Sequence, residues 1–457
     1  MKGAGLIRLY KTVHFVGIGG IGMSGIAEVL CNLGYKVTGS DISEGSSVER
    51  LRGLGVEINI GHRAENIVDA HVVVISSAVK EDNVEVIEAN RRGIPVIPRA
   101  EMLAELGRLK YSILIAGSHG KTTTTSLIST ILSYAGLDPT IVVGGKLIAT
   151  DTNATLGSGE LFVAEADESD GSFLKLNPTI AVVTNIDREH MDHYGNMEVL
   201  KDAFIAFLNK IPFYGVSIIC LEDPNIKEIM PKLSRHFMTY GFTDQADYYA
   251  DNIKTGFMSS QYDLFYKGKL IERIKLPLSG RHNVLNSVAA IAASLALEVE
   301  MDKIKESIAV FKGIKRRCEF KGEVGGIKVF DDYGHHPTEI KMTLSGINSH
   351  RHIVVFQPHR YSRTRDLMDD FASVFIDVTK LYLMDIYTAG EKEIQGVNSR
   401  VLFDLMTKKG VNVTYVENRN EIPSMLIEEC KAGDILITCG AGDVWKVGER
   451  FVSEYKV

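Results

Sequence analysis

Short runs of β-branched and other apolar residues alternate with helical patterns along most of the chain. This alternation is typical of parallel α/β sheets, whose strands are buried on both faces and are connected through helices. Two short polar segments, at 107–110 and 313–317, divide the expected strands and helices into three blocks. The pattern predicts three α/β domains, covering residues 1–107, 108–314 and 315–457.

The expected strands are the short apolar runs within these blocks. They lie at 13–16, 36–38 and 72–75, then at 113–116, 162–164, 180–183 and 218–221, and finally at 329–330, 353–356, 381–383 and 435–437. Residues 246–278 differ, because Tyr-rich alternation and a turn at 267–269 favour an antiparallel insertion. The longest apolar stretch, 284–299, is rich in Ala and broken by polar residues, which favours a buried helix over a membrane span.

Composition narrows the classes of function. At 457 residues the chain is too long for one hydrophobic core. Its net charge is 51 − 58 = −7, whereas nucleic-acid binders usually carry a basic excess. Five scattered cysteines form no CxxC pair and no apolar leader opens the chain, so we expect a cytoplasmic protein with reduced thiols. We expect no nucleic-acid or membrane partner, and a monomer or weak homodimer.

A glycine-rich loop follows the first expected strand. The sequence Gly17-Ile-Gly-Gly-Ile-Gly22 opens a helix, and Asp41 lies 19 residues beyond Gly22. This is the dinucleotide-binding fingerprint, in which backbone amides hold a pyrophosphate and the acidic residue binds a ribose hydroxyl. A UDP-sugar satisfies the same chemistry. An NAD-binding oxidoreductase and a turn without ligand stay open as alternatives.

A second glycine loop, Gly117-Ser-His-Gly-Lys-Thr-Thr123, follows the strand expected at 113–116. Its amides would surround a phosphate, Lys121 would neutralise the β- and γ-oxygens, and Thr122 would offer a hydroxyl to Mg²⁺. The usual loop has a glycine where this chain has Ile115. We therefore predict a shortened ATP-binding loop, followed by an amphipathic helix that ends near Gly136.

Acidic residues gather where two strands of the second block end. Because the carboxyl ends of parallel strands face the ligand crevice, both clusters should open toward Lys121. Mg²⁺ prefers oxygen ligands, so the candidates are Glu165 or Glu168, together with Thr122 and His190. Two neighbouring residues, Asp187 and Glu189, are interpreted as solvated loop charges.

With these features and the motifs further along, the chain resembles the Mur ligases, and within them the branch that adds L-alanine to UDP-N-acetylmuramate. The resemblance covers essentially the whole chain. Besides both glycine loops, it rests on motifs beginning at Glu165, Thr184, Gly280, Arg316, Asp331 and Gln357.

The resemblance implies an α/β fold of three domains: a Rossmann-like N-terminal domain, a central P-loop ATPase-like domain and a C-terminal Rossmann-like domain. They would bind the UDP-sugar, ATP and the amino acid respectively. It also implies ATP-dependent ligation of UDP-N-acetylmuramate and L-alanine with Mg²⁺, through an acyl phosphate and then a tetrahedral intermediate.

Site residues are carried over to matching positions only. The UDP-sugar would be bound by Gly19, Gly22, Asp41, Ser76 and Ser77. ATP would be bound by Gly117, Ser118, His119, Gly120, Lys121, Thr122, Thr123, Asn283, Arg317 and Asp332. The amino acid would be held by His336, Arg360 and Arg363, and the metal by Thr122, Glu165 and His190. The residues implied in catalysis are Lys121, Glu165, His190, Arg317 and His336.

One departure concerns the carbamoylated lysine that several relatives carry about fifteen residues after the metal histidine. Ile205 stands at that point and Lys201 is out of register, so we expect no carbamoylated lysine. His335 and His336 precede Pro337 and could orient or deprotonate the incoming amine, but His335 is interpreted equally well as part of a structural turn. Three alternatives stay open: a ligase that adds a whole peptide to the same sugar, the oxidoreductase, and a P-loop ATPase that drives a partner protein.

Overall fold

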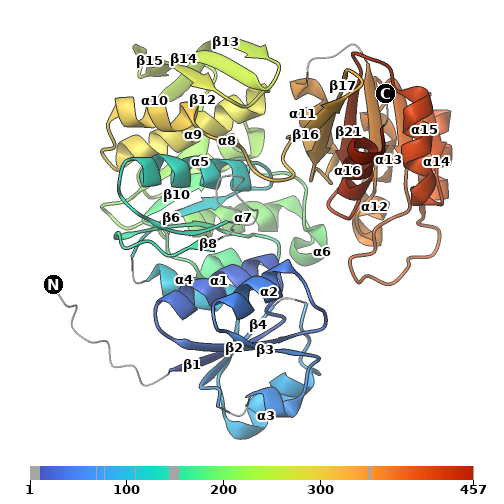
Figure 1. Cartoon of the computed structure of the whole chain (residues 1–457). Helices are drawn as coiled ribbons and strands as arrows, with labels where there is room; N and C mark the ends of the chain where they lie inside the picture. Colours follow the sequence, from blue (N-terminus) through green and yellow to red (C-terminus); the bar gives the residue numbers. More distant parts are fainter. Residues whose placement is uncertain are drawn as a thin grey trace. The chain divides into compact units, whose positions relative to one another are not determined.

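The protein is described from a computed structural model, which covers residues 11–67, 69–76, 78–108, 110–143, 154–347 and 351–455. Three sheets are present, of five, ten and six strands (Figure 1). The expectation of three sheet-containing α/β domains is therefore confirmed. The chain forms two compact units, one of 1–253, 261–276 and 283–311, the other of 254–260, 277–282 and 312–457.

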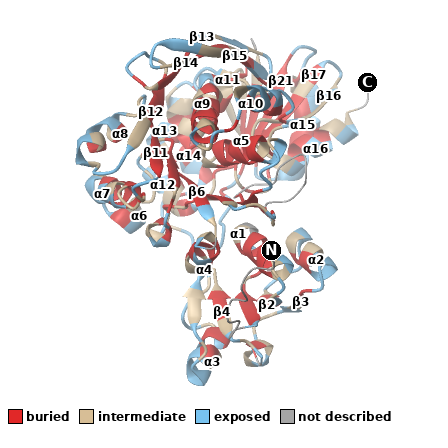
Figure 2. Cartoon of the chain, turned by 90° about the vertical axis from the view of Figure 1, so that its left-hand side faces the viewer, coloured by how far each residue is buried: buried red, intermediate tan, exposed pale blue. Residues whose placement is uncertain are grey.

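The N-terminal sheet is parallel, in the order β3-β2-β1-β4-β5. Helices α1, α2 and α4 cover one face and α3 the other (Figures 1 and 2). The elements are β1 (Thr12–Val16), α1 (Ile21–Asn32), β2 (Lys36–Asp41), α2 (Ser46–Gly53), β3 (Glu57–Ile60), the 3₁₀ helix η1 (Ala64–Ile67), β4 (Val72–Ile75), α3 (Val84–Arg92), β5 (Val96–Pro98) and α4 (Arg99–Gly107).

The central sheet has the order β15-β14-β13-β12-β11-β10-β6-β9-β7-β8. Its parallel part runs from β13 to β7, and the strands at its middle are almost fully buried (Figure 2). The elements up to the end of the parallel part are β6 (Tyr111–Ala116), α5 (Lys121–Tyr134), β7 (Thr140–Val142), β8 (Ala154–Thr155), β9 (Leu161–Glu165), η2 (Ser172–Lys175), β10 (Ile180–Val183), α6 (Met191–Tyr194), α7 (Met197–Leu208), β11 (Val216–Cys220), α8 (Pro224–Ile229), η3 (Met230–Lys232) and β12 (Phe237–Gly241).

The insertion expected at 246–278 is a three-stranded extension of this sheet. Its strands are β13 (Tyr248–Gly256), β14 (Ser259–Tyr266) and β15 (Lys269–Leu276). Each pair of neighbours is joined by only two residues, which requires the chain to reverse, so the expected antiparallel arrangement is present. The helix expected after it is α9 (Arg281–Ala296), which is largely buried, followed by α10 (Met301–Ala309).

The third sheet has the order β16-β17-β21-β18-β19-β20, with only β16 antiparallel to its neighbour. Apolar residues of α15 and α16 pack on one face, and those of α11, α13 and α14 on the other. The elements are β16 (Glu319–Val324), β17 (Ile327–Asp332), α11 (Pro337–Gly346), β18 (His352–Phe356), α12 (Tyr361–Asp366), α13 (Met368–Val374), β19 (Lys380–Leu383), α14 (Ser399–Lys408), β20 (Val413–Tyr415), η4 (Arg419–Glu421), α15 (Ile422–Glu429), β21 (Ile435–Cys439) and α16 (Trp445–Glu454). Within the described ranges, every helix is too short or too polar to cross a bilayer.

Candidate functional site

The second glycine loop connects β6 to α5, as the sequence predicts. Gly117 and Gly120 have φ angles of 122° and 84°, a region that favours glycine. Two loop amides are occupied within the protein: Ser118 donates to the Asn185 carbonyl at 3.1 Å, and His119 donates to Asn185 Oδ1 at 2.8 Å. A phosphate would meet the amides at the start of α5, because the first N–H groups of a helix have no acceptors within it.

Lys121 lies at the start of α5 and is tied to the loop and to an acidic residue. Its Nζ donates to the Gly117 carbonyl at 2.5 Å and to the two carboxylate oxygens of Glu168 at 2.9 and 3.0 Å. Burial would lower the pKa of Lys121, but Glu168 and Asp167 raise it above its usual range. Burial raises the pKa of Glu168 to about 7, against the opposing charge of Lys121. Lys121 is therefore a cation that lies against the glycine loop.

Three possible metal ligands lie beside this lysine. Ligand atoms of Glu168, Glu189 and His190 lie within 4.8 Å of one another, and Glu168 is 1% exposed. Two carboxylates and an imidazole are a donor set that a divalent cation accepts. Of the two candidates weighed in the sequence, Glu168 belongs to this trio. Glu165 ends β9 beside Ile115, and its assignment to the metal stays a prediction, as does that of Thr122 in the first turn of α5.

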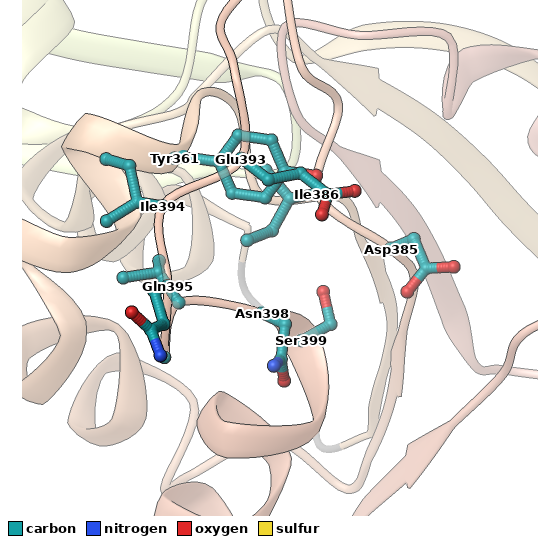
Figure 3. Close-up of a pocket in the computed structure, with 10 residues that line it drawn as sticks. Tyr361, Asp385, Ile386, Glu393, Ile394, Gln395, Asn398 and Ser399 are labelled. Carbon is teal, nitrogen blue, oxygen red and sulfur yellow. The ribbon is translucent and has the colours of Figure 1, made fainter.

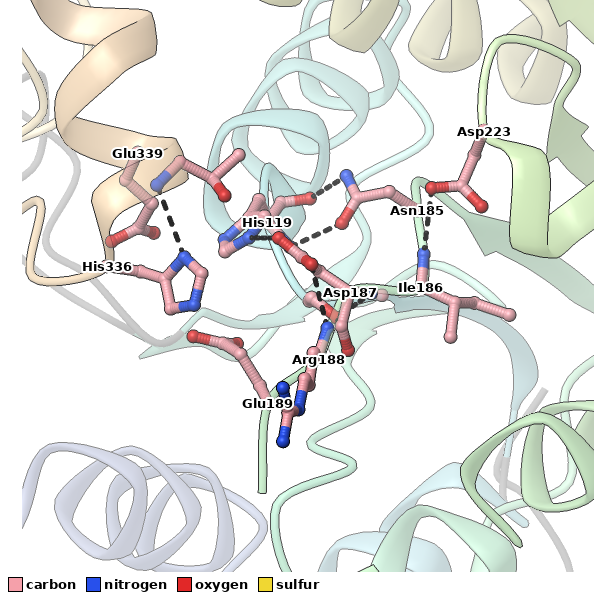
Figure 4. Close-up of polar contacts among 12 residues, drawn as sticks. His119, Asn185, Ile186, Asp187, Arg188, Glu189, Asp223, His336 and Glu339 are labelled. Atoms are coloured by element: carbon pink, nitrogen blue, oxygen red, sulfur yellow. Dashed lines mark hydrogen bonds and ion pairs between the residues drawn. The ribbon is translucent and has the colours of Figure 1, made fainter. Parts of the chain in front are cut away.

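Asp187 and Glu189 are not solvated loop charges, so that interpretation is wrong. Asp187 Oδ2 lies 2.9 Å from His119 Nε2, and its amide donates to Ser118 Oγ at 2.8 Å (Figure 4). The side chain of Glu189 is only 10% exposed. The segment after β10 is thus hydrogen-bonded to the glycine loop. The residue types alone do not predict this contact. Helix α9 also contacts the loop, since Asn286 Oδ1 lies 2.5 Å from where a Cβ on Gly120 would stand, and Asn283 Oδ1 accepts a hydrogen bond from Asn286 at 3.3 Å.

The N-terminal glycine loop joins β1 to α1. The amides of Gly17 and Ile18 donate to the Ser40 carbonyl at 2.8 and 3.0 Å, and the Gly19 amide donates to Asp41 Oδ2 at 2.8 Å. Asp41 therefore lies against the loop, where the fingerprint requires it. Ser76 also reaches this loop, because its Oγ lies 3.2 Å from the Cβ position of Gly17. Ser77 lies outside the described residues.

Arg317 and Asp332, which we predict to reach the nucleotide, and His336, which we predict to hold the amino acid, lie around the connection from β17 to α11. Arg317 donates to Glu339 at 3.2 Å and lies 5.4 Å from the Tyr333 ring centroid. Asp332 accepts from the amides of Cys318 and Gly334, both at 2.7 Å. His336 is the N-cap of α11, and its Nδ1 accepts from the Thr338 amide at 3.3 Å. Its neighbour His335, which the sequence left open, is the histidine that joins the cluster described next.

The arginines predicted for the amino acid follow β18. The Nη1 atom of Arg363 lies 3.3 Å from His359 Nδ1, whereas the Arg360 side chain is exposed. His359, which the sequence did not single out, stacks on Tyr387 with centroids 5.5 Å apart and lies 5.9 Å from the His335 ring. Burial, with the nearby charges of Arg363 and Arg360, lowers the pKa of His359 to about 4. A neutral histidine thus lies among arginine charges, a field that suits a carboxylate.

The third domain also has a cavity of about 610 Å³, lined by Tyr361 and by residues between β19 and α14 (Figure 3). The acidic side chains of Asp385 and Glu393 face it. None of the residues predicted to hold the amino acid lines this cavity. It is therefore distinct from the cluster around His359 and Arg363.

Three family models match successive parts of the chain. The model described as Mur ligase family, catalytic domain, matches residues 12–111. The Mur ligase middle domain matches 115–294, and the Mur ligase, glutamate ligase domain, matches 316–442.

Similar proteins extend over the whole chain. A UDP-N-acetylmuramate–L-alanine ligase of Geobacter sulfurreducens is 54% identical over 97% of both chains, and one of Trichlorobacter lovleyi is 55% identical over 97% of this chain and 98% of its own. A crystal structure of a UDP-N-acetylmuramate-alanine ligase from Thermotoga maritima matches with a TM-score of 0.82 and 28% identity, over 97% of this chain and 99% of that one. With both glycine loops and near-complete matches in agreement, the chain belongs to the Mur ligase family.

Proposed function

We propose that the protein joins L-alanine to UDP-N-acetylmuramate in an ATP-dependent ligation, a step in the synthesis of peptidoglycan precursors. The observation that carries the proposal is the presence of two phosphate-type loops in one unit, each at the carboxyl end of a parallel strand and the start of a helix. One loop serves the sugar nucleotide and the other serves ATP. The identity above 50% to ligases named for this reaction supports the same assignment.

The chemistry needs an activated carboxylate, because a carboxylate oxygen is a poor leaving group. Transfer of the γ-phosphoryl group to the sugar's carboxylate turns that oxygen into part of a phosphate. Lys121 and the first-turn amides of α5 stabilise the charge on the transferred group. Mg²⁺, whose ligand preferences the trio of Glu168, Glu189 and His190 fits, would neutralise phosphate oxygens there. Thr122 and Glu165 are the further ligands that we propose for it.

The amino acid is assigned to the second unit. His336, Arg360 and Arg363 would hold its carboxylate, with the neutral imidazoles of His335 and His359 beside them. His336 is also the N-cap of α11. Arg317 and Asp332 would contact ATP. We assign the UDP-sugar, ATP and the amino acid to segments 1–107, 108–314 and 315–457 respectively. The five free cysteines support a cytoplasmic location.

The test is phosphate release measured with each substrate omitted in turn. A ligase releases phosphate only when ATP, UDP-N-acetylmuramate and L-alanine are all present, whereas an ATPase that drives a partner would turn over ATP alone. Offering the tripeptide in competition with L-alanine distinguishes a peptide-adding ligase, and titration with NADH tests the oxidoreductase. Lys121→Ala should lose at least about 100-fold in kcat while the protein stays folded by circular dichroism. Retained activity in that variant would contradict the loop assignment.

A further inference from the structure

Arg99 lies over the first turn of the helix that follows the N-terminal glycine loop. It is the first residue of α4, and its Nη1 atom lies 2.9 Å from where a Cβ on Gly22 would stand. The guanidinium of Arg99 thus occupies space beside Gly22 that a side chain at this position would share. The first N–H groups of a helix have no acceptors within it, so a cation and backbone donors meet at one place.

The other end of the same guanidinium meets a carboxylate from the central domain. Nη2 of Arg99 lies 3.5 Å from Asp167 Oδ2, with the two side chains 25% and 43% exposed. A single long contact between partly exposed groups is a weak ion pair. Asp167 precedes Glu168, the residue that holds Lys121. Arg99 thus lies between the sugar-nucleotide loop and the acidic segment of the ATP site.

We propose that Arg99 binds the diphosphate of the sugar nucleotide, and that Asp167 is the counter-ion which this diphosphate displaces. The inference rests on the proposed function, because it needs a UDP-sugar at the N-terminal loop. A diphosphate diester carries two negative charges and offers pairs of non-bridging oxygens, which the guanidinium fork binds more strongly than one distant carboxylate. Asp167 and the substrate therefore compete for the same cation.

The competition predicts opposite effects of two substitutions on affinity for the sugar nucleotide. Arg99→Gln removes the cation and should raise the Kd for UDP-N-acetylmuramate about tenfold or more. Asp167→Asn removes the competitor and should lower that Kd about two- to fivefold. Arg99→Lys keeps the charge but not the fork, so its Kd should lie between those of the wild type and Arg99→Gln. A purely structural role for the pair would make both substitutions weaken binding.

A neighbouring ion pair supplies the matched control. Lys175 of η2 lies 3.0 Å from Glu101, which is two residues beyond Arg99 on α4. This pair also joins α4 to the central domain, and its two side chains are comparably exposed, at 45% and 41%. Glu101→Gln breaks the connection without touching the glycine loop, so it should leave the Kd within about twofold of the wild type.

Calorimetric titration of the full-length chain with UDP-N-acetylmuramate, without ATP, measures these values. Separate titrations with an ATP analogue should give the same Kd for Arg99→Gln as for the wild type. The inference fails if Arg99→Gln binds the sugar nucleotide within twofold of the wild type, if Glu101→Gln loses as much affinity, or if Asp167→Asn binds more weakly. If the wild type itself does not bind the sugar nucleotide, it is the proposed function that fails.

Discussion

Behind the N-terminal glycine loop lies a carboxylate with no exposed surface. Glu85 on α3 accepts from Ser40 Oγ at 2.6 Å and from Asn66 Nδ2 at 2.5 Å, and His14 Nε2 lies 3.5 Å away. The carbonyl of the same Ser40 holds the amides of Gly17 and Ile18. The loop is thus anchored through Ser40 to a buried polar network, and such a network stabilises only while every member is paired.

The first prediction, at the scale of single residues, concerns Glu85→Gln. Burial alone would raise the pKa of Glu85, but the nearby His14 ring and hydrogen bonds from Ser40 and Asn66 lower it below the ordinary 4.5. A folded-state pKa below the unfolded one stabilises the fold at neutral pH, and this contribution is lost as pH falls through the lowered folded value. We expect Glu85→Gln to reduce the free energy of unfolding by about 2 kcal/mol at pH 7, and by less below pH 4.

Urea unfolding of both proteins across this pH range measures the difference. The control is Glu88→Gln on the same helix, where the carboxylate pairs with Arg91 and Arg92 at the surface. That variant should unfold nearly as the wild type does. If the free energy of unfolding falls by the same amount at every pH in Glu85→Gln, the shape of the Glu85 side chain and not its charge is responsible.

Sequence reasoning at this scale identified residue types but not their partners. The positions of Lys121 and Asp41 could be predicted, because each follows a loop whose spacing fixes it. Asp187 and Glu189 were assigned wrongly, since nothing in the local pattern shows that the segment after β10 folds over His119. His359 was missed for a similar reason: its neighbours Tyr387 and His335 come from other strand ends of the sheet.

At the scale of elements, the ATP loop depends on the close approach of two connections. A Cβ on Gly117 would collide with Thr184 Oγ1 and lie 2.9 Å from the Asn185 carbonyl oxygen, and the φ of Gly117 is already 122°. Gly136, which ends α5 as expected, has a φ of 80° but no atom within 4 Å of its Cβ position. Both glycines have a positive φ that favours glycine, but only Gly117 is crowded by neighbouring atoms.

The second prediction compares alanine at these two positions. Gly136→Ala should lower the free energy of unfolding by about 1 to 2 kcal/mol through the left-handed backbone, with an unchanged KM for ATP. Gly117→Ala should push the loop away from residues 184–185 and raise the KM for ATP at least about tenfold. Steady-state kinetics with chemical unfolding separates the effects. Similar KM values in the two variants would contradict the idea that the ATP loop depends on its contact with residues 184–185.

The strands that could be predicted are those at the middle of the three sheets. Runs such as 113–116 and 353–356 lie in β6 and β18, which are buried on both faces and so consist of apolar residues throughout. Short strands nearer the edges were missed, among them β3, which is mostly exposed, and β20, which is half-buried. Their positions are fixed by pairing with a neighbouring strand, which a local pattern does not contain.

At the scale of the whole molecule, the N-terminal sheet and most of the central sheet belong to one compact unit. Three domains could be predicted because each has its own sheet, but the joining of two of them could not. Ion pairs such as Lys175 with Glu101 connect them, and exposed charges at such positions look the same in a sequence whether or not they meet a partner. The third sheet lies in a separate unit that resumes at Lys312.

The last prediction follows from this division. The residues assigned to ATP and the UDP-sugar lie mainly in the first unit, and those assigned to the amino acid in the second. An acyl phosphate exposed to water would hydrolyse, so the amine has to be brought to it in a closed site. The connection is suited to turning, because Gly313 has a φ of 87° and Arg316 a φ of 60° close to the passage between units. We therefore expect the third domain, beyond the connection, to rotate about residues 313–317 when ATP and the sugar nucleotide bind.

Small-angle scattering with an ATP analogue and UDP-N-acetylmuramate should show a smaller radius of gyration than the free protein. The rotation depends on nucleotide phosphates being held at the first turn of α5, so Lys121→Ala should show little or no contraction with the same ligands. Identical profiles for the free and liganded wild type, with binding established by calorimetry, would contradict the rotation. An equal decrease of the radius of gyration in Lys121→Ala would show instead that the sugar nucleotide alone causes the rotation.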